Sequence, residues 1–256
     1  MHIISAAIQK GGSGKTTTAL NLAAALRDQG KTCLLVDLDP QANLSQSLGV
    51  QDELEPNIYH LLKQEAFGKP IRVEEAILEK SGLDLIPSSL ELASAELELV
   101  SVYGREKIMN QMLQRLDRQY DYIFIDCPPS IGILTVNALV ASQYILLPLN
   151  AEFLSFKGAK SFLRHLELVK RLNNEIAVLG FVLTKFDTRK TMNQEVREQL
   201  RKEFGPDTVF QTYIRSNIAL AQAQEQGIDI FSFKKNANGA QDYRQLATEF
   251  LAKIAE

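Results

Sequence analysis

Residues 9–17 read QKGGSGKTT, and this stretch sets the architecture predicted for the chain. It lies between an apolar run, HIISAAI at 2–8, and a segment of helical character at 15–28. Glycines between a strand and a helix let several backbone N–H groups turn toward one point, where the helix dipole adds positive potential. A lysine and a threonine that follow such a loop, here Lys15 and Thr16, are typical of a phosphate site that also holds Mg²⁺. The stretch therefore predicts a nucleotide phosphate site at the end of the first strand.

The loop deviates from the commonest phosphate-loop pattern at its start. That pattern begins with a glycine, but this chain has Gln9 there and a second lysine, Lys10, directly after it. The predicted nucleotide-binding residues are Lys10, Gly11, Gly12, Ser13, Gly14, Lys15, Thr16 and Thr17.

Apolar runs and helix-like segments alternate beyond the loop. The runs lie at 2–8, 32–38, 83–88, 122–126, 144–150 and 176–184, and the helix-like segments lie at 15–28, 91–101, 105–119, 131–142, 155–173, 191–204, 217–226 and 240–255. Runs without polar alternation indicate strands covered on both faces, which is typical of a parallel sheet. The order predicts one doubly wound α/β P-loop NTPase domain over 1–256, with a mostly parallel sheet, helices on both faces and no DNA-binding module before the first strand. The least regular segment, 50–82 with breaks at Pro56 and Pro70, is expected to be a peripheral helical insertion.

Composition narrows the class of protein. The chain has 256 residues, of which 45% are hydrophobic and 23% are charged, and this composition excludes disordered, collagen-like and coiled-coil proteins. Cys33 and Cys127 each stand in an apolar run, which favours buried reduced thiols and a cytosolic protein. The apolar start of the chain is too short for a signal peptide or a membrane span, so no export is expected. Residues 151–256 carry 16 Lys and Arg against 13 Asp and Glu, a mild excess that permits a polyanion site.

Three aspartates follow predicted strands. Asp37 and Asp39 stand in VDLDPQAN at 36–43, and Asp126 ends YIFID at 122–126. The carboxyl ends of parallel strands face the ligand crevice of an open sheet, so these carboxylates are expected near the phosphate loop. A carboxylate buried by apolar neighbours needs a compensating cation, and Mg²⁺ is the predicted partner of Asp126. Because side chains alternate along a strand, Asp39 is expected to face the crevice and Asp37 to support the loop.

The stretch KGGSGKTTTALNLAAALRDQGKTCLLVDLDPQANLSQSLG at 10–49 resembles the opening of the ParA/Soj branch of the ParA/MinD superfamily of deviant Walker ATPases. The similarity continues in that family's order through YDYIFIDCPPSIG at 120–132, LLPLNAEFLSFKG at 146–158 and GFVLTKFDTRKTMNQEVREQLRKEFG at 180–205. It is specific over the first 50 residues and much less so over the last 60.

The resemblance implies an ATPase with ATP and Mg²⁺ as cofactors and a nucleotide-sandwich homodimer. Lys10 matches the family's signature lysine, which crosses to the partner's phosphates and makes dimerisation depend on ATP, much as an arginine finger completes a site. Asp39 matches the carboxylate that positions the attacking water, and Asp126 matches the Walker B aspartate. The implied catalytic residues are therefore Lys10, Lys15 and Asp39, and the implied metal ligands are Thr16, Asp39 and Asp126.

Three functions share this ATPase core. A partition ATPase binds DNA nonspecifically as an ATP dimer and is released when a ParB-like or adaptor protein stimulates its slow hydrolysis, which segregates plasmid, chromosome or other cargo on the nucleoid. A MinD-like membrane switch would end in a basic amphipathic helix, but AQDYRQLATEFLAKIAE at 240–256 has an apolar stripe with a neutral to acidic back, which predicts a packing helix and no membrane partner. A metal-cluster carrier would need paired cysteines, and the sequence has only Cys33 and Cys127, so it offers no second ligand beside Cys127. Partition is the expected function, with the membrane switch as the alternative.

The expected DNA contacts are basic residues of the second half, where cations meeting phosphates suffice for nonspecific binding. They are Lys185, Arg189, Lys190, Arg197, Arg201, Lys202 and Arg215. The segment IRSNIALAQAQEQG at 214–227 departs from the family pattern, because a DNA-contacting arginine of that pattern falls on Ala219. Either Arg215 substitutes for it or the DNA face lies at 185–202. Lys185 and Asp187 end a predicted strand and are equally open to base recognition or a surface role.

Overall fold

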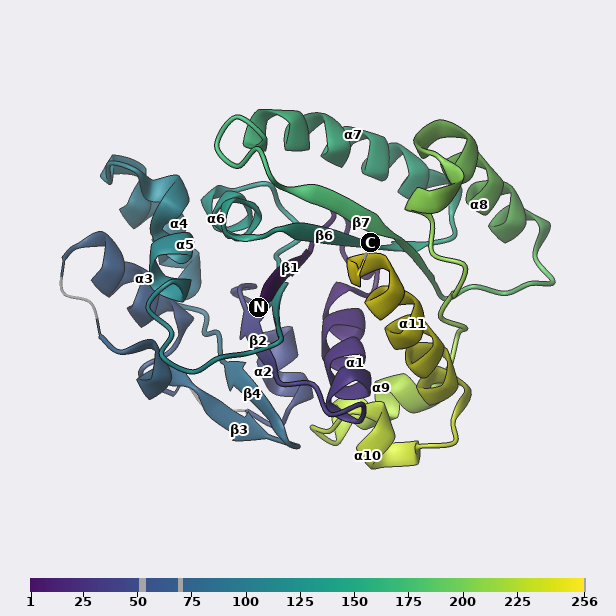
Figure 1. Cartoon of the computed structure of the whole chain (residues 1–256), viewed down its shortest axis with the longest axis horizontal. Coiled ribbons are helices and arrows are strands. Elements are labelled where there is room, and N and C mark those ends of the chain that lie inside the picture. The colour runs from purple at the N-terminus through teal and green to yellow at the C-terminus, as the bar shows by residue number, and fades with distance from the viewer. Residues whose placement is uncertain (51–53, 69–70, 256) are drawn as a thin grey trace.

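The computed structural model describes residues 1–50, 54–68 and 71–255, and a seven-stranded sheet forms its centre (Figure 1). The strands are β1 (His2–Ala6), β2 (Cys33–Asp37), β3 (Leu78–Lys80), β4 (Leu83–Ile86), β5 (Tyr122–Asp126), β6 (Tyr144–Asn150) and β7 (Ala177–Thr184). Their spatial order is β3-β4-β2-β5-β1-β6-β7, and all neighbours are parallel except β3 and β4. The predicted α/β class with a mostly parallel sheet is confirmed.

Helices cover both faces of this sheet. They are α1 (Lys15–Arg27), α2 (Asn43–Ser47), α3 (Ile58–Ala66), α4 (Leu92–Glu98), α5 (Ile108–Leu113), α6 (Ile133–Ala141), α7 (Phe153–Val169), α8 (Thr191–Phe204), α9 (Ile218–Glu225), α10 (Ile230–Lys234) and α11 (Asn238–Ala255). Helices α6 and α7 lie on one side in Figure 1, and α1, α9, α10 and α11 lie on the other. The sheet is therefore doubly wound, as predicted.

Each central strand contributes side chains to two separate hydrophobic cores. In β5, Ile123 and Ile125 join the core under α3 to α8, whereas Phe124 joins the core under α1 and α11. All three are fully buried. Burial on both faces explains why these strands read as continuous apolar runs without polar alternation.

The sequence predictions missed the shortest elements and misplaced some ends. The edge strand β3 has three residues, none of them fully buried, and so leaves no apolar run. Helices α2 and α10 have five residues each, which is too few for a helical period to show. The helix predicted over 105–119 is shorter, since α5 begins at Ile108 after a 3₁₀ turn and ends at Leu113. Beyond it, the Tyr120 hydroxyl donates to Asp84 at 2.7 Å. Helix α3 lies in the predicted insertion at 50–82, while Pro70 lies outside the described residues.

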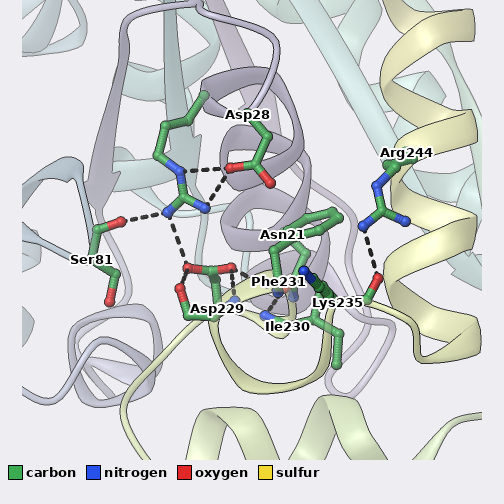
Figure 2. A network of polar contacts seen from close by, with 10 residues as sticks. Asn21, Asp28, Ser81, Asp229, Ile230, Phe231, Lys235 and Arg244 are labelled. Atoms are coloured by element: carbon green, nitrogen blue, oxygen red, sulfur yellow. Dashed lines mark hydrogen bonds and ion pairs between the residues drawn. The ribbon is translucent and has the colours of Figure 1, made fainter.

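Arg27 ties the C-terminal end of α1 to two other parts of the chain, and Figure 2 labels its partners Asp28, Ser81 and Asp229. Its guanidinium donates to Asp28 at 2.8 Å, to Asp229 at 3.1 Å and to the carbonyl oxygen of Ser81 in the β3–β4 turn. Asp229 is fully buried and also caps α10 by accepting from the Phe231 N–H at 2.8 Å. This network fastens the edge hairpin and the C-terminal helices to the helix that follows the phosphate loop.

The last helix packs as the sequence predicts. Tyr243, Leu246, Ala247 and Phe250 of α11 are fully buried in the core beneath α1. Within the described ranges, no helix is long and apolar enough to cross a membrane.

Candidate functional site

The loop between β1 and α1 takes a conformation that depends on glycine. Gly12 and Gly14 have φ of 69° and 92°, in the left-handed region that other residues avoid. A Cβ on Gly14 would also lie 3.2 Å from the Thr184 side chain. Gly14 precedes α1, and no described side chain caps that helix, so the N–H groups of its first turn face the loop. The arrangement is a cradle for an anionic group.

Lys15 closes one wall of the cradle. Its side chain is buried, and its ammonium donates to the Lys10 carbonyl oxygen at 3.1 Å. An ammonium has three donors, and the described residues accept one hydrogen bond from it. Lys15 therefore keeps donors that could bind phosphate oxygens, and its role there stays a prediction.

Thr16 and Asp126 meet beside the loop. The Thr16 hydroxyl donates to Asp126 Oδ2 at 2.6 Å, while Oδ1 of the same carboxylate is buried with no hydrogen-bond partner in the part of the chain that the structure describes. Burial, together with the charge of Asp37, raises the pKa of Asp126 to about 8. An orphaned carboxylate oxygen beside a hydroxyl is a pair of hard oxygen donors, which fits Mg²⁺. A cation there would supply the missing partner and charge.

Asp37 and Asp39 lie in different surroundings: Asp39 faces the cavity, whereas Asp37 supports the turn after β2 and not the phosphate loop. Asp37 is fully buried and accepts from the Ser45 N–H and hydroxyl at 2.8 and 2.7 Å and from the Asp39 N–H at 3.2 Å. Burial raises the pKa of Asp37 to about 6. Asp39 lines the cavity beside the loop and accepts from the Gln41 N–H at 3.0 Å. Asp37 thus holds the turn, and Asp39 presents its carboxylate to the cavity.

The cavity has a volume of about 560 Å³ and extends from the phosphate loop to the segment at 214–217 and to α9. Its far end is lined by Ile214, Arg215, Ser216, Asn217, Leu220, Ala221, Gln224 and Tyr243. A phosphate cradle at one end and a mixed apolar and polar end are suited to a nucleoside triphosphate.

The sequence predictions did not include Asn150 and Thr184, two residues that support the phosphate loop. The Thr184 hydroxyl lies 2.8 Å from the Ser13 carbonyl oxygen and 2.8 Å from Asn150 Oδ1, and the Asn150 amide donates to the Gly12 carbonyl oxygen at 3.2 Å. These contacts fasten the ends of β6 and β7 to the loop. A polar residue closing each apolar run, LLPLN and FVLT, was the signal that could have found them.

Lys10 heads the loop but lies outside the cavity that the loop lines. Its ammonium donates to Glu152 Oε2 at 2.8 Å and to the buried Ser155 hydroxyl at 2.7 Å, at the start of α7. The hydrogen bond and charge of Lys10 hold the pKa of Glu152 below its usual range. The lysine side chain is 26% exposed.

The predicted DNA residues fall into three groups: exposed residues, half-buried residues and residues that line the nucleotide cavity. Arg189, Lys190 and Lys202 are exposed. Arg197 and Arg201 are half-buried, and both donate to the Gln211 side chain, at 3.1 and 2.7 Å.

Lys185 and Arg215 line the nucleotide cavity. Arg215 also donates to Asp242 at 2.6 Å. Of the two residues considered for base recognition, Lys185 reaches the cavity, whereas Asp187 accepts from Arg189, whose hydrogen bonds lower the pKa of Asp187 to about 2.

Comparisons with known proteins agree with this geometry. A family model described as AAA domain matches residues 1–178. The sporulation initiation inhibitor protein Soj of Bacillus subtilis is 39% identical over 98% of this chain and 98% of its own length. The chromosome-partitioning ATPase Soj of Thermus thermophilus is 40% identical over 99% of this chain and 96% of its own length.

Solved structures share the fold, among them two that hold nucleotide analogues. Cobyrinic acid a,c-diamide synthase from Mycobacterium smegmatis, with a bound ATP analogue and magnesium, is 32% identical with a TM-score of 0.85 and covers 100% of this chain and 96% of that one. A plasmid partition protein from Borrelia burgdorferi bound to AMPPNP is 26% identical with a TM-score of 0.82 and covers 99% of both chains.

Proposed function

This chain belongs to the Soj/ParA family of partitioning ATPases, and on that premise we propose that its ATP-bound form is a sandwich dimer that binds DNA without sequence preference. It is an ATPase, and its cofactors are ATP and Mg²⁺. Thr16 and Asp126 would hold the Mg²⁺, with Asp39 facing the same cavity, and the ion supplies positive charge that stabilises the transferring phosphoryl group.

The position of Lys10 carries the proposal. Its ammonium lies on Glu152 and Ser155 rather than in its own cavity, although it begins the phosphate loop. In a sandwich dimer Lys10 would exchange these contacts for the partner's phosphates, where a second cation neutralises charge that develops on the transferring group. Pairing of two chains would then require bound ATP.

The exposed cations after β7 support the DNA step. Lys190 and Lys202 lie at the two ends of α8 with exposed side chains, Arg189 lies beside Lys190 on Asp187, and dimerisation would double this positive field. Nonspecific binding needs only such a field, because each phosphate contact releases a counterion. We place the ATP dimer on the nucleoid, and a ParB-like or adaptor partner would stimulate hydrolysis and so release it with its cargo.

DNA retention at several salt concentrations, with and without a nonhydrolysable ATP analogue, tests the proposal. The Asp39→Ala variant should bind ATP, fail to hydrolyse it and stay on DNA as a trapped dimer. Double replacement of Lys190 and Lys202 by alanine should weaken DNA binding and lower the salt dependence by about 0.9 per lost phosphate contact. A matched double replacement of the exposed Lys107 and Arg171 by alanine should leave DNA affinity and its salt dependence unchanged. A trapped dimer with no affinity for DNA would refute the DNA step and leave the ATPase standing.

A further inference from the structure

A second cavity, of about 490 Å³, lies between the end of α4, the start of α6 and the end of α7. We call it the α4–α7 groove. Aliphatic residues form most of its wall, including Val100, Ile131, Val136, Leu168 and Leu172. Val100 and Leu168 are each 58% exposed, and Leu172 is 45% exposed. Clustered exposed apolar side chains mark surfaces that contact another molecule.

One unpaired carboxylate faces this groove. Glu96 has no hydrogen bond or ion pair with any described residue, whereas the groove's other charges, Arg105 and Glu106, neutralise each other at 3.3 Å. The Glu96 carboxylate lies so close to Gly132 that a Cβ there would be 2.0 Å from Oε1. The groove therefore combines an aliphatic wall with a single net negative charge, which complements an aliphatic surface carrying a cation.

The groove and the nucleotide cavity share one short segment. Pro129 lines the nucleotide cavity, while Ile131 and Gly132 line the groove. The Thr135 hydroxyl donates to the Ser130 carbonyl oxygen at 2.7 Å, which attaches the segment to α6. Asp126, the predicted metal ligand, stands three residues before Pro129. A molecule that fills the groove would thus touch the segment that also contacts the nucleotide.

We propose that the α4–α7 groove is the docking site of the hydrolysis-stimulating partner, and that the partner docks through an aliphatic segment that places a lysine or arginine beside Glu96. This inference rests on the proposed function, because it names the surface and chemistry of that partner. Occupancy of the groove shifts residues 129–132 and so changes the rate of ATP hydrolysis.

Two synthetic 18-residue helical peptides with the same leucine face, one with lysines and one with glutamates on its polar face, serve as probes. Affinity is measured by fluorescence anisotropy, and ATP turnover is measured on the same samples. The lysine peptide should bind the full chain at least about tenfold more tightly than the glutamate peptide and should raise turnover. Leu168→Asp should weaken its binding about tenfold and Glu96→Gln about threefold. Met192→Asp, on the distant α8 and 55% exposed, is the matched control and should change nothing (Figure 1).

Three results would overturn the inference: equal binding of the two peptides, equal binding to wild type and Leu168→Asp, or bound peptide without any change in turnover. Positions 168 and 192 are exposed, so a charge introduced there is not buried and folding should be retained, which circular dichroism checks. ATP turnover and DNA retention of the peptide-free protein are measured separately. Their loss would contradict the proposed function, while their presence without groove binding would contradict only this inference.

Discussion

The two ends of helix α1 differ in whether their polar groups have hydrogen-bond partners. At the N-terminal end, Ser13 Oγ and Asp126 Oδ1 are buried without a hydrogen-bond partner among the described residues, and no such side chain caps the helix. At the C-terminal end, Arg27 donates to three acceptors, and in the middle of the helix the Asn21 side chain accepts from the Ile230 N–H at 2.9 Å (Figure 2). One end is completed by the chain itself, and the other is left open.

This difference between the two ends of α1 predicts which residues affect nucleotide binding and which affect the stability of the fold. A buried polar group without a partner costs about 1–3 kcal/mol, and a folded chain tolerates that cost mainly where a ligand supplies the partner. The open end of α1 should therefore govern nucleotide binding and hydrolysis with little effect on folding, and the closed end should govern folding with little effect on the nucleotide.

The largest expected effect is on hydrolysis. Asp39→Ala should lower ATP turnover by about 10²-fold or more, because the variant lacks the carboxylate that we propose positions the attacking water, and should leave ATP affinity unchanged. Phosphate release and equilibrium binding of a fluorescent ATP analogue measure the two. Asp28→Ala, at the other end of α1, is the control and should hydrolyse ATP normally. Equal turnover in wild type and Asp39→Ala would exclude the assigned role.

Lys15→Ala should lower ATP affinity by more than about 100-fold, since it removes the buried cation aimed at the phosphates. Its free energy of unfolding without nucleotide should stay within about 0.5 kcal/mol of wild type, because the Lys15 ammonium makes one hydrogen bond with the described residues and faces an Asp126 carboxyl whose pKa is raised to about 8. Calorimetric titration and urea unfolding test both halves. A Lys15→Ala variant that is strongly destabilised but still binds ATP would contradict the expected difference between the two ends of α1.

Arg27→Ala should show the opposite pattern. Removing it leaves the fully buried Asp229 without its cation, which should cost about 2–3 kcal/mol of unfolding free energy given that Arg27 is itself partly exposed. ATP affinity of the folded fraction should not change. Arg27→Lys should recover only part of the loss, because an ammonium cannot replace the guanidinium fork. Unaltered stability in Arg27→Ala would contradict the account.

The smallest expected effect is on how the free energy of unfolding depends on pH. Asp126, beside the N-terminal end of α1, and Asp229, beside its C-terminal end, should change this dependence in opposite directions. The pKa of Asp126 is raised to about 8 by burial and the Asp37 charge, so its contribution to stability falls as pH rises from the ordinary carboxyl range toward 8. Burial alone would raise the pKa of Asp229, but hydrogen bonds from Ser232 and Arg27 hold it below the ordinary value. The contribution of Asp229 is therefore complete above that value and is lost only as pH falls below it.

Urea unfolding without nucleotide or Mg²⁺, at about pH 5 and about pH 8, tests this pair. Asp126→Asn should gain more stability over wild type at the higher pH, whereas Asp229→Asn should lose the same amount at both. A constant effect of Asp126→Asn would show that its carboxyl is not perturbed.

The central sheet and the phosphate end of the site could be predicted from the sequence, because local patterns determine them. A glycine-rich loop after an apolar run, and aspartates at the ends of other runs, place Lys15, Thr16 and Asp126 together once the strands are parallel. Strand β3 could not be predicted, since its three residues are held by pairing with β4 and lack an apolar pattern of their own.

The nucleoside end and the partners of the basic residues depend on contacts between distant segments. Asn150 and Thr184 meet the loop across more than a hundred residues. Arg215 was assigned to DNA on sequence grounds, yet its pairing with Asp242 on α11 places it at the nucleotide cavity. No local pattern around 215 contains that carboxylate.

The molar mass of the protein with Mg²⁺ and a nonhydrolysable ATP analogue, measured by light scattering for wild type and Lys10→Ala, tests most directly whether the loop's first lysine couples ATP to pairing. Wild type should double from 28.6 kDa on adding the analogue, while Lys10→Ala should bind the analogue and keep the mass of one chain. A wild type that stays at the mass of one chain, or a Lys10→Ala variant that doubles as readily, would contradict the account.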